Sequence, residues 1–119
     1  MIECKNGAVS SLISKSDANQ LSGSVHWFRA QYDQTCVPTP LIIHPSRTFL
    51  KQASPEPHTR VMDATRLADL AGAFRDFIKG IATNEKYLIA SEVEKSLAHF
   101  GLTGNQFVDR YSADFSIST

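Results

Sequence analysis

The sequence predicts an α/β fold in which a small parallel strand pair, joined by one helix, is packed with several C-terminal helices. Short apolar segments at 1–5 and 39–44 have the length of strands, and an amphipathic segment at 16–32 lies between them. Strand, crossover helix and strand form a βαβ unit, whose strands lie parallel and whose connection is right-handed. Helical periodicity dominates the second half of the chain.

Length and composition favour one folded domain. The chain has 119 residues, of which 42% are hydrophobic, and this is enough to bury a core. Twelve basic residues balance twelve acidic ones, so no overall field draws the chain to nucleic acid or to an anionic membrane, and contact with DNA requires a local patch. We expect a single domain over 1–119, with a βαβ part at 1–45 and a mainly helical part at 61–111.

The chain carries no signal for secretion or for membrane insertion. The two cysteines, Cys4 and Cys36, lack the paired spacing of a metal site, and we expect free thiols. The N-terminus has no basic region followed by an apolar run, and no stretch approaches the roughly 18 apolar residues of a spanning helix. We therefore expect a cytoplasmic protein that does not enter a membrane.

The first three elements follow from apolar spacing. A strand is expected over Met1–Lys5, and a helix over Ser16–Tyr32, where Asp17 is a favourable first-turn charge. A second strand is expected over Thr39–His44, whose continuous apolar run suits a strand buried on both faces. The inward face of the helix is expected to hold Ala18, Leu21, Val25, Phe28 and Tyr32. Trp27 lies off this stripe, either on a second packing face or as an exposed aromatic for a partner, and we favour packing.

A long irregular segment is expected over 46–60, where prolines are frequent, and Val61-Met62 adds a short strand. Asp63 is then a good N-cap for a helix that extends to Ala82. The apolar positions of this helix are Leu67, Leu70, Ala71, Phe74, Phe77, Ile78 and Ile81.

The C-terminal part is expected to hold two more helices and a tail. One helix runs from Thr83-Asn84 to about Phe100 and is terminated by Gly101. A short closing helix begins at 103–105 and ends at Tyr111, and 112–119 is expected to be a loosely held tail. The inward residues of the longer helix are expected to be Leu88, Ile89, Val93, Leu97 and Phe100.

Glu3 and Lys5 are the first candidates for chemistry. Residues two apart on a strand face the same side, so these two side chains are expected to project together. A carboxylate can hold Mg²⁺, and a neighbouring ammonium can stabilise the charge that develops on a scissile phosphate. The same pair also fits an ordinary exposed ion pair, because Glu-x-Lys is frequent by chance.

The start of the following helix carries a second group of candidates. Lys15, Asp17 and Gln20 lie within its first turns, at the end of a helix that is best suited to meet phosphate. Polar side chains are also common there as caps, and Gln20 fits that role as well. His26 and His44 have no spacing that predicts a metal site.

Three segments carry a resemblance to a known family. They are Ile2-Glu3-Cys4-Lys5, Ile13-Ser14-Lys15-Ser16-Asp17-Ala18-Asn19-Gln20-Leu21 and Thr39-Pro40-Leu41-Ile42-Ile43-His44-Pro45. Together they resemble the C-terminal half of a PD-(D/E)XK, or restriction-endonuclease-like, nuclease domain. The resemblance implies that Glu3 binds the metal, that Lys5 assists hydrolysis and that Gln20 approaches the site. It implies Mg²⁺ as the cofactor and DNA as the substrate.

The family also uses an aspartate on a preceding strand, and nothing precedes Met1 to supply it here. The chain is then a fragment of a larger nuclease, a shortened relative that has lost metal chemistry, or a protein that takes the missing acid from elsewhere in the fold or from another subunit. Its catalytic status stays open at this point. If active, the chain is a metal-dependent DNA endonuclease.

A local basic rim is the candidate surface for DNA. Arg47, Lys51 and Arg60, with Lys15 at the start of the first helix, are expected to contact phosphates, although simple solvation explains such residues equally well. The leading hypothesis is a truncated or degenerate nuclease module of a DNA-processing system. The alternative is a non-catalytic, dimeric α/β module for protein interaction.

A homodimer is expected in either case, because so few strands leave the edges of a sheet exposed. Its interface is expected either between strand edges or on the apolar surplus of the last helices, around Leu97, Phe100 and Phe107.

Overall fold

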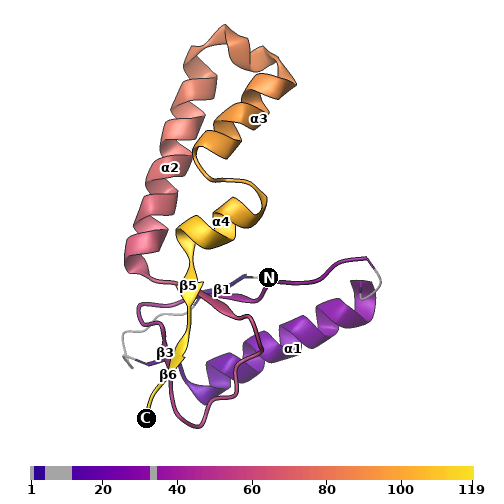
Figure 1. Ribbon diagram of the computed structural model, residues 1–119, viewed down its shortest axis with the longest axis vertical. Helices are drawn as coiled ribbons and strands as arrows, with labels where there is room; N and C mark the ends of the chain where they lie inside the picture. Colours follow the sequence, from indigo (N-terminus) through magenta and orange to yellow (C-terminus); the bar gives the residue numbers. More distant parts are fainter. Residues whose placement is uncertain (1, 5–11, 33–34) are drawn as a thin grey trace. The chain divides into compact units, whose positions relative to one another are not determined.

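The computed structural model describes residues 2–4, 12–32 and 35–119 (Figure 1). Over these residues the chain has a mixed α/β fold that includes parallel strand pairs, as predicted. It divides into two compact units, Met1–Ala64 with Ser112–Thr119, and Thr65–Tyr111. The first unit holds the strands and the first helix, and the second is helical.

The main sheet has four short strands in the order β1-β2-β4-β5. Their bounds are Ile2–Cys4 for β1, Leu41–Ile43 for β2, Arg60–Met62 for β4 and Ala113–Asp114 for β5. The β1, β2 and β4 strands run parallel, and β5 pairs with β4 antiparallel. The predicted parallel pairing of the first two strands is thus confirmed, and the apolar run of β2 is explained by its position between two neighbours.

Helix α1 (Lys15–Tyr32) begins at a capping interaction that its sequence encodes. The Asp17 backbone N–H donates to Ser14 Oγ at 3.1 Å, and the Ser14 hydroxyl donates to the Asp17 carboxylate at 2.9 Å. The buried face of α1 contributes Ala18 and Leu21 to the core of the unit. The other members of this core cluster are Ile13, Ile42, Phe49, Ala53 and Val61, with Phe115 packed against them.

The predicted burial of two residues of α1 was wrong. Tyr32, expected to face inward, is 49% exposed and lies against Phe28, with the ring centroids 5.0 Å apart. Trp27, expected to pack, is 60% exposed. The reason is its position on the helix: it follows the fully buried Val25 by two residues, about 200° around the axis, and therefore points away from the core.

The segment at 46–60 and the C-terminal tail are more ordered than predicted. Strand β3 (Thr48–Phe49) lies within the first, and β6 (Ser116–Ile117) lies within the second. They pair in parallel with each other, Phe49 also bridges to Ile13, and the Phe115 ring meets the Phe49 ring edge to face at 5.3 Å. With β5 in the main sheet, the tail forms two strands of this unit and is not loosely held.

The second unit contains α2 (Ala64–Thr83), the 3₁₀-helix η1 (Glu85–Leu88), α3 (Ala90–His99) and α4 (Gly104–Tyr111), and Figure 1 shows α3 running alongside α2. The single helix predicted from 84 to 100 is wrong. Asn84 Oδ1 caps η1 by accepting from the Lys86 N–H at 3.0 Å, and Ile89 adopts an extended conformation that separates η1 from α3. Leu88 and Ile89, expected to be inward, are 88% and 58% exposed.

Gly101 ends α3 as predicted. Its φ of 67° is in the left-handed region that favours glycine. The Leu102 N–H donates to the Leu97 carbonyl at 2.9 Å and the Gly101 N–H donates to the Ala98 carbonyl at 3.1 Å, which together form a Schellman motif. The turn that follows leads directly into α4, whose predicted extent is also confirmed.

The apolar stripe of α2 is only partly covered. Phe77 is buried, but Leu67, Phe74 and Ile78 are 41%, 54% and 42% exposed. Periodicity correctly predicted the helix, but much of its apolar stripe is accessible to solvent. None of the helices in the described part of the chain combines the length and apolarity that a membrane crossing requires.

Candidate functional site

The candidate catalytic strand is β1, at the edge of the main sheet. Glu3 is its central residue, and its Cα partner across the parallel ladder is Ile42 of β2, which in turn is the partner of Val61 of β4. Ile42 and Val61 are fully buried in the same cluster as Leu21 of α1. In the backbone register of the sheet, Glu3 thus lies opposite Ile42, and Ile42 lies opposite Val61.

Of the other two predicted catalytic residues, the structure describes only Gln20. Lys5 lies outside the described residues. Gln20 is an exposed residue in the second turn of α1, directly before the buried Leu21. The strand that carries Glu3 and the helix that carries Gln20 thus belong to one βαβ unit, as the order of the apolar segments predicted.

Three of the four predicted DNA-binding residues are arranged around one backbone bridge. Ile13 and Phe49 form a parallel bridge, with the Ile13 N–H donating to the Thr48 carbonyl and the Leu50 N–H donating to the Ile13 carbonyl, both at 2.9 Å. Lys15 and Lys51 each follow a bridged residue by two positions, so both lie beyond the same end of the bridge. Arg47 precedes Phe49 by two positions, and all three basic residues are exposed.

Arg60, the fourth, is placed differently. It is the first residue of β4, and its guanidinium is engaged by the C-terminal segment. Nε donates to Ser112 Oγ at 3.0 Å, one terminal nitrogen donates to the Ser112 carbonyl at 2.9 Å, and the other pairs with Asp114 at 2.6 Å. These contacts give Arg60 a clear structural role in joining β4 to β5.

Sequence reasoning missed a polar cluster that attaches the loop before β4 to α1. The Glu56 carboxylate accepts from the Ser22 hydroxyl at 2.5 Å and lies 3.2 Å from His26 Nε2 and 3.7 Å from Arg29. The Glu56 side chain is only 14% exposed. Nothing in the sequence predicts this pairing, because the partners are separated by 34 residues in the case of Ser22.

In the part of the chain that the structure describes, side chains that could bind a metal are not clustered. No group of three or more His, Cys, Asp or Glu side chains is placed there to hold an ion. His44 is buried, and its Nδ1 accepts from the Ser46 N–H at 2.9 Å, so its ring supports the turn after β2. Cys36 is a free, exposed thiol.

The second unit contains an apolar groove. It has a volume of about 440 Å³ and lies between α2 and the α3–α4 segment. Its lining consists of Leu67, Leu70, Ala71, Phe74, Leu97, Leu102 and Phe107. Leu97 and Phe107 are two of the three residues around which the sequence predicted an interface.

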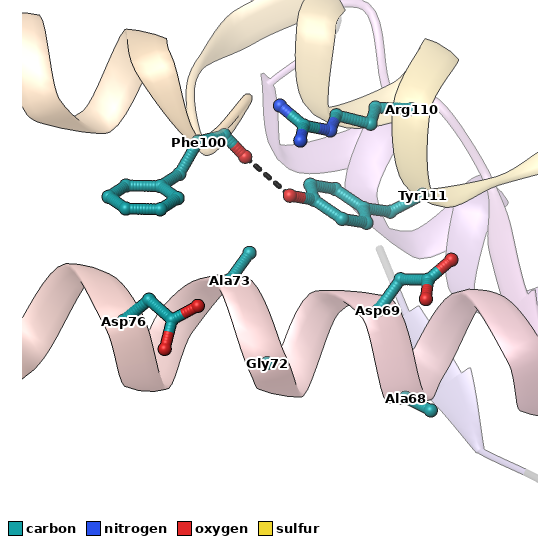
Figure 2. A pocket seen from close by; sticks show the side chains of 8 residues that line it. All are labelled: Ala68, Asp69, Gly72, Ala73, Asp76, Phe100, Arg110 and Tyr111. Atoms are coloured by element: carbon teal, nitrogen blue, oxygen red, sulfur yellow. Dashed lines mark hydrogen bonds between the residues drawn. The ribbon is translucent and has the colours of Figure 1, made fainter.

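The other side of the same helix faces a more polar hollow, which Figure 2 shows. Asp69 and Asp76 of α2 line one wall, and Phe100, Arg110 and Tyr111 line the other. The Tyr111 hydroxyl donates to the Phe100 carbonyl, and Arg110 donates to the His99 carbonyl at 3.2 Å. These bonds fasten α4 to the end of α3, so the polar groups on that wall serve the packing of the unit.

Comparison with known proteins identifies no relative. No family model matches the sequence, and no curated protein or solved structure is detectably similar to it.

Proposed function

We propose that this chain is a nuclease-fold module of a DNA-processing system, a truncated or degenerate PD-(D/E)XK-like domain that acts in the cytoplasm. The observation that carries the proposal is the parallel β1–α1–β2 unit with Glu3 at the centre of β1. In such a unit the catalytic strand and the helix that follows it supply the metal-binding and phosphate-facing groups. Here these are Glu3, Lys5 and Gln20, with Mg²⁺ held by Glu3.

Two further features support this assignment. The strand that carries Glu3 pairs in parallel with β2, and the helix that joins these two strands carries the exposed Gln20. Exposed Lys15, Lys51 and Arg47 lie around the Ile13–Phe49 bridge of the same unit, and in the proposal they bind DNA phosphates. Arg60 joins them only if its contacts with Ser112 and Asp114 are exchanged for phosphate.

Metal binding by Glu3 tests the proposal most directly. We expect the purified chain to bind Mn²⁺, followed by the loss of the free-ion paramagnetic resonance signal, and the Glu3→Gln variant to bind it at least tenfold more weakly, because an amide oxygen lacks the charge of a carboxylate. Glu85→Gln, which alters an exposed carboxylate of the other unit, is the matched control. Equal Mn²⁺ binding by the wild-type and Glu3→Gln proteins, with both folded by circular dichroism, would contradict the proposal.

A second candidate function is a non-catalytic, homodimeric module for protein interaction. The apolar groove of the second unit favours it, because exposed apolar surfaces of this kind mark interaction sites. The two candidates differ in one measurable respect. A nuclease-fold module binds DNA through the basic residues around the Ile13–Phe49 bridge, whereas an interaction module shows no salt-dependent binding of DNA.

A further inference from the structure

The ion pair between β4 and β5 joins a largely buried cation to an exposed anion. Arg60 and Asp114 are Cα partners in this antiparallel pair of strands, and the Arg60 guanidinium lies 2.6 Å from the Asp114 carboxylate. The Arg60 side chain is 19% exposed, whereas the Asp114 side chain is 90% exposed. A positive charge that is mostly withdrawn from water is therefore neutralised by a carboxylate that lies almost entirely in water.

The exposed partner is the one that can leave the pair. A side chain as exposed as Asp114 loses little packing when it rotates into solvent, and exposed ion pairs contribute little to stability. The Arg60 guanidinium, in contrast, is poorly hydrated in its position, so it favours an anionic partner. Its contacts with Ser112 are to a hydroxyl and a carbonyl oxygen, which are neutral. An anion from outside the chain that replaces Asp114 therefore keeps the charge of Arg60 neutralised.

A phosphate is the anion that fits this position best. The planar guanidinium donates in a fixed geometry that matches the oxygens of a phosphate. The C-terminal segment also links Arg60 to the basic residues around the Ile13–Phe49 bridge. The Ser116 N–H, two residues after Asp114, donates to the carbonyl of the exposed Arg47 at 3.1 Å. A DNA strand that contacts Arg47 therefore reaches Arg60 by continuing along this segment.

We propose that Arg60 is a phosphate-binding residue of the DNA interface and that Asp114 is its built-in competitor. In the free protein the Asp114 carboxylate occupies the guanidinium, and DNA has to displace it before a phosphate oxygen can accept from Arg60. The C-terminal segment thus lowers the affinity for DNA for as long as Asp114 stays in place. The inference rests on the proposed DNA-binding function and adds to that function a residue that limits it.

Fluorescence anisotropy of a labelled DNA duplex, titrated with the full-length chain, tests the competition. Asp114→Asn nearly keeps the size of the side chain and removes its charge, so we expect it to bind DNA roughly fivefold more tightly than the wild-type protein at low salt. The slope of log K against log salt concentration is expected to steepen by up to about 0.9, the value for one additional phosphate contact. Asp114→Ser, which removes the charge with a smaller side chain, is expected to give the same gain.

Asp76→Asn is the matched control for the loss of one negative charge. Asp76 is also an exposed aspartate beside an arginine, since its carboxylate lies 3.7 Å from Arg75 Nε, and it belongs to the other unit. We expect this variant to bind DNA with nearly the affinity and salt dependence of the wild-type protein, because surface charges that are far from the bound phosphates are largely screened.

The double variant Asp114→Asn/Arg60→Gln identifies the residue that takes the phosphate. We expect it to lose the gain of Asp114→Asn, whereas a general effect of the removed negative charge would persist. A gain that survives Arg60→Gln, or one no larger than that of Asp76→Asn, with all variants folded by circular dichroism, would overturn this inference and leave the proposed DNA interface intact. Absence of salt-dependent DNA binding by both the wild-type and the Asp114→Asn proteins would overturn the proposed function together with it.

Discussion

At the residue scale, the positions with a strict backbone or packing requirement were the most predictable. Gly101 is an example, because a helix that ends in a left-handed residue calls for glycine, and the sequence contains one where the apolar periodicity stops. Glu56 is the opposite case. Its burial against Ser22, His26 and Arg29 depends on two segments that meet only in the folded chain, so no local pattern could have predicted it.

Replacing Gly101 tests this distinction. Gly101→Ala is expected to lower the free energy of unfolding by about 1 to 3 kcal/mol, because φ is 67° and the added Cβ would lie 2.7 Å from Arg110 Cδ. Gly104→Ala is the matched control, since Gly104 also has a positive φ of 56° but open space around the Cβ position. Urea denaturation measures both, and an equal loss in the two variants would mean that the contact with Arg110 is unimportant.

Activity of the chain also depends on single residues. We expect the purified chain to cleave plasmid DNA only marginally with Mg²⁺ or Mn²⁺, because Mg²⁺ is usually held by one or two carboxylates together with water and phosphate, and Glu3 alone is a poor anchor for the ion. Gel electrophoresis of nicked plasmid measures this. Clear nicking that both Glu3→Gln and Lys5→Ala abolish, with both variants folded, would contradict the prediction and would show that a second acid comes from within the chain or from a partner copy.

At the element scale, the helices and the parallel strands follow from local apolar spacing. The continuous apolar run of β2 and the periodicity of α1 were sufficient to predict a βαβ unit, and its parallel pairing is confirmed. The break between η1 and α3 was not predictable in the same way, because Leu88 and Ile89 continue the apolar count while Ile89 itself is extended. Periodicity counts apolar residues and does not reveal whether another element covers them.

Helix α1 provides a comparison of two apolar positions. Leu21→Ala is expected to cost about 2 to 5 kcal/mol of stability, because Leu21 is 2% exposed in the core cluster and its truncation leaves a cavity. Trp27→Ala is expected to cost less than about 1 kcal/mol, because Trp27 is mostly exposed. Thermal unfolding followed by far-ultraviolet circular dichroism compares the two. A Trp27→Ala loss as large as that of Leu21→Ala would show that the tryptophan is packed after all.

At the scale of the whole molecule, the first unit is built from two stretches of chain that are far apart in the sequence, and the sequence did not predict this. The helical unit at 65–111 is inserted between the main part of the first unit and its last eight residues, 112–119. Those residues supply β5 to the main sheet and β6 to the smaller one, and Ser112 and Asp114 hold Arg60. Strand pairs between residues more than 50 positions apart leave no local signal, and a polar tail therefore looked loosely held.

Removal of the tail tests whether these strands support the first unit. A chain that ends at Tyr111 loses β5 and β6, the contact of Phe115 with Phe49 and the partners of Arg60, so we expect a clear fall in its urea midpoint. Trp27 is the only tryptophan and belongs to the first unit, so its fluorescence follows the unfolding of that unit specifically. Ile117→Ser, at a residue that is 47% exposed, is the control and should shift the midpoint little. An unchanged midpoint for the truncated chain would mean that the tail contributes no stability and that the first unit is complete without it.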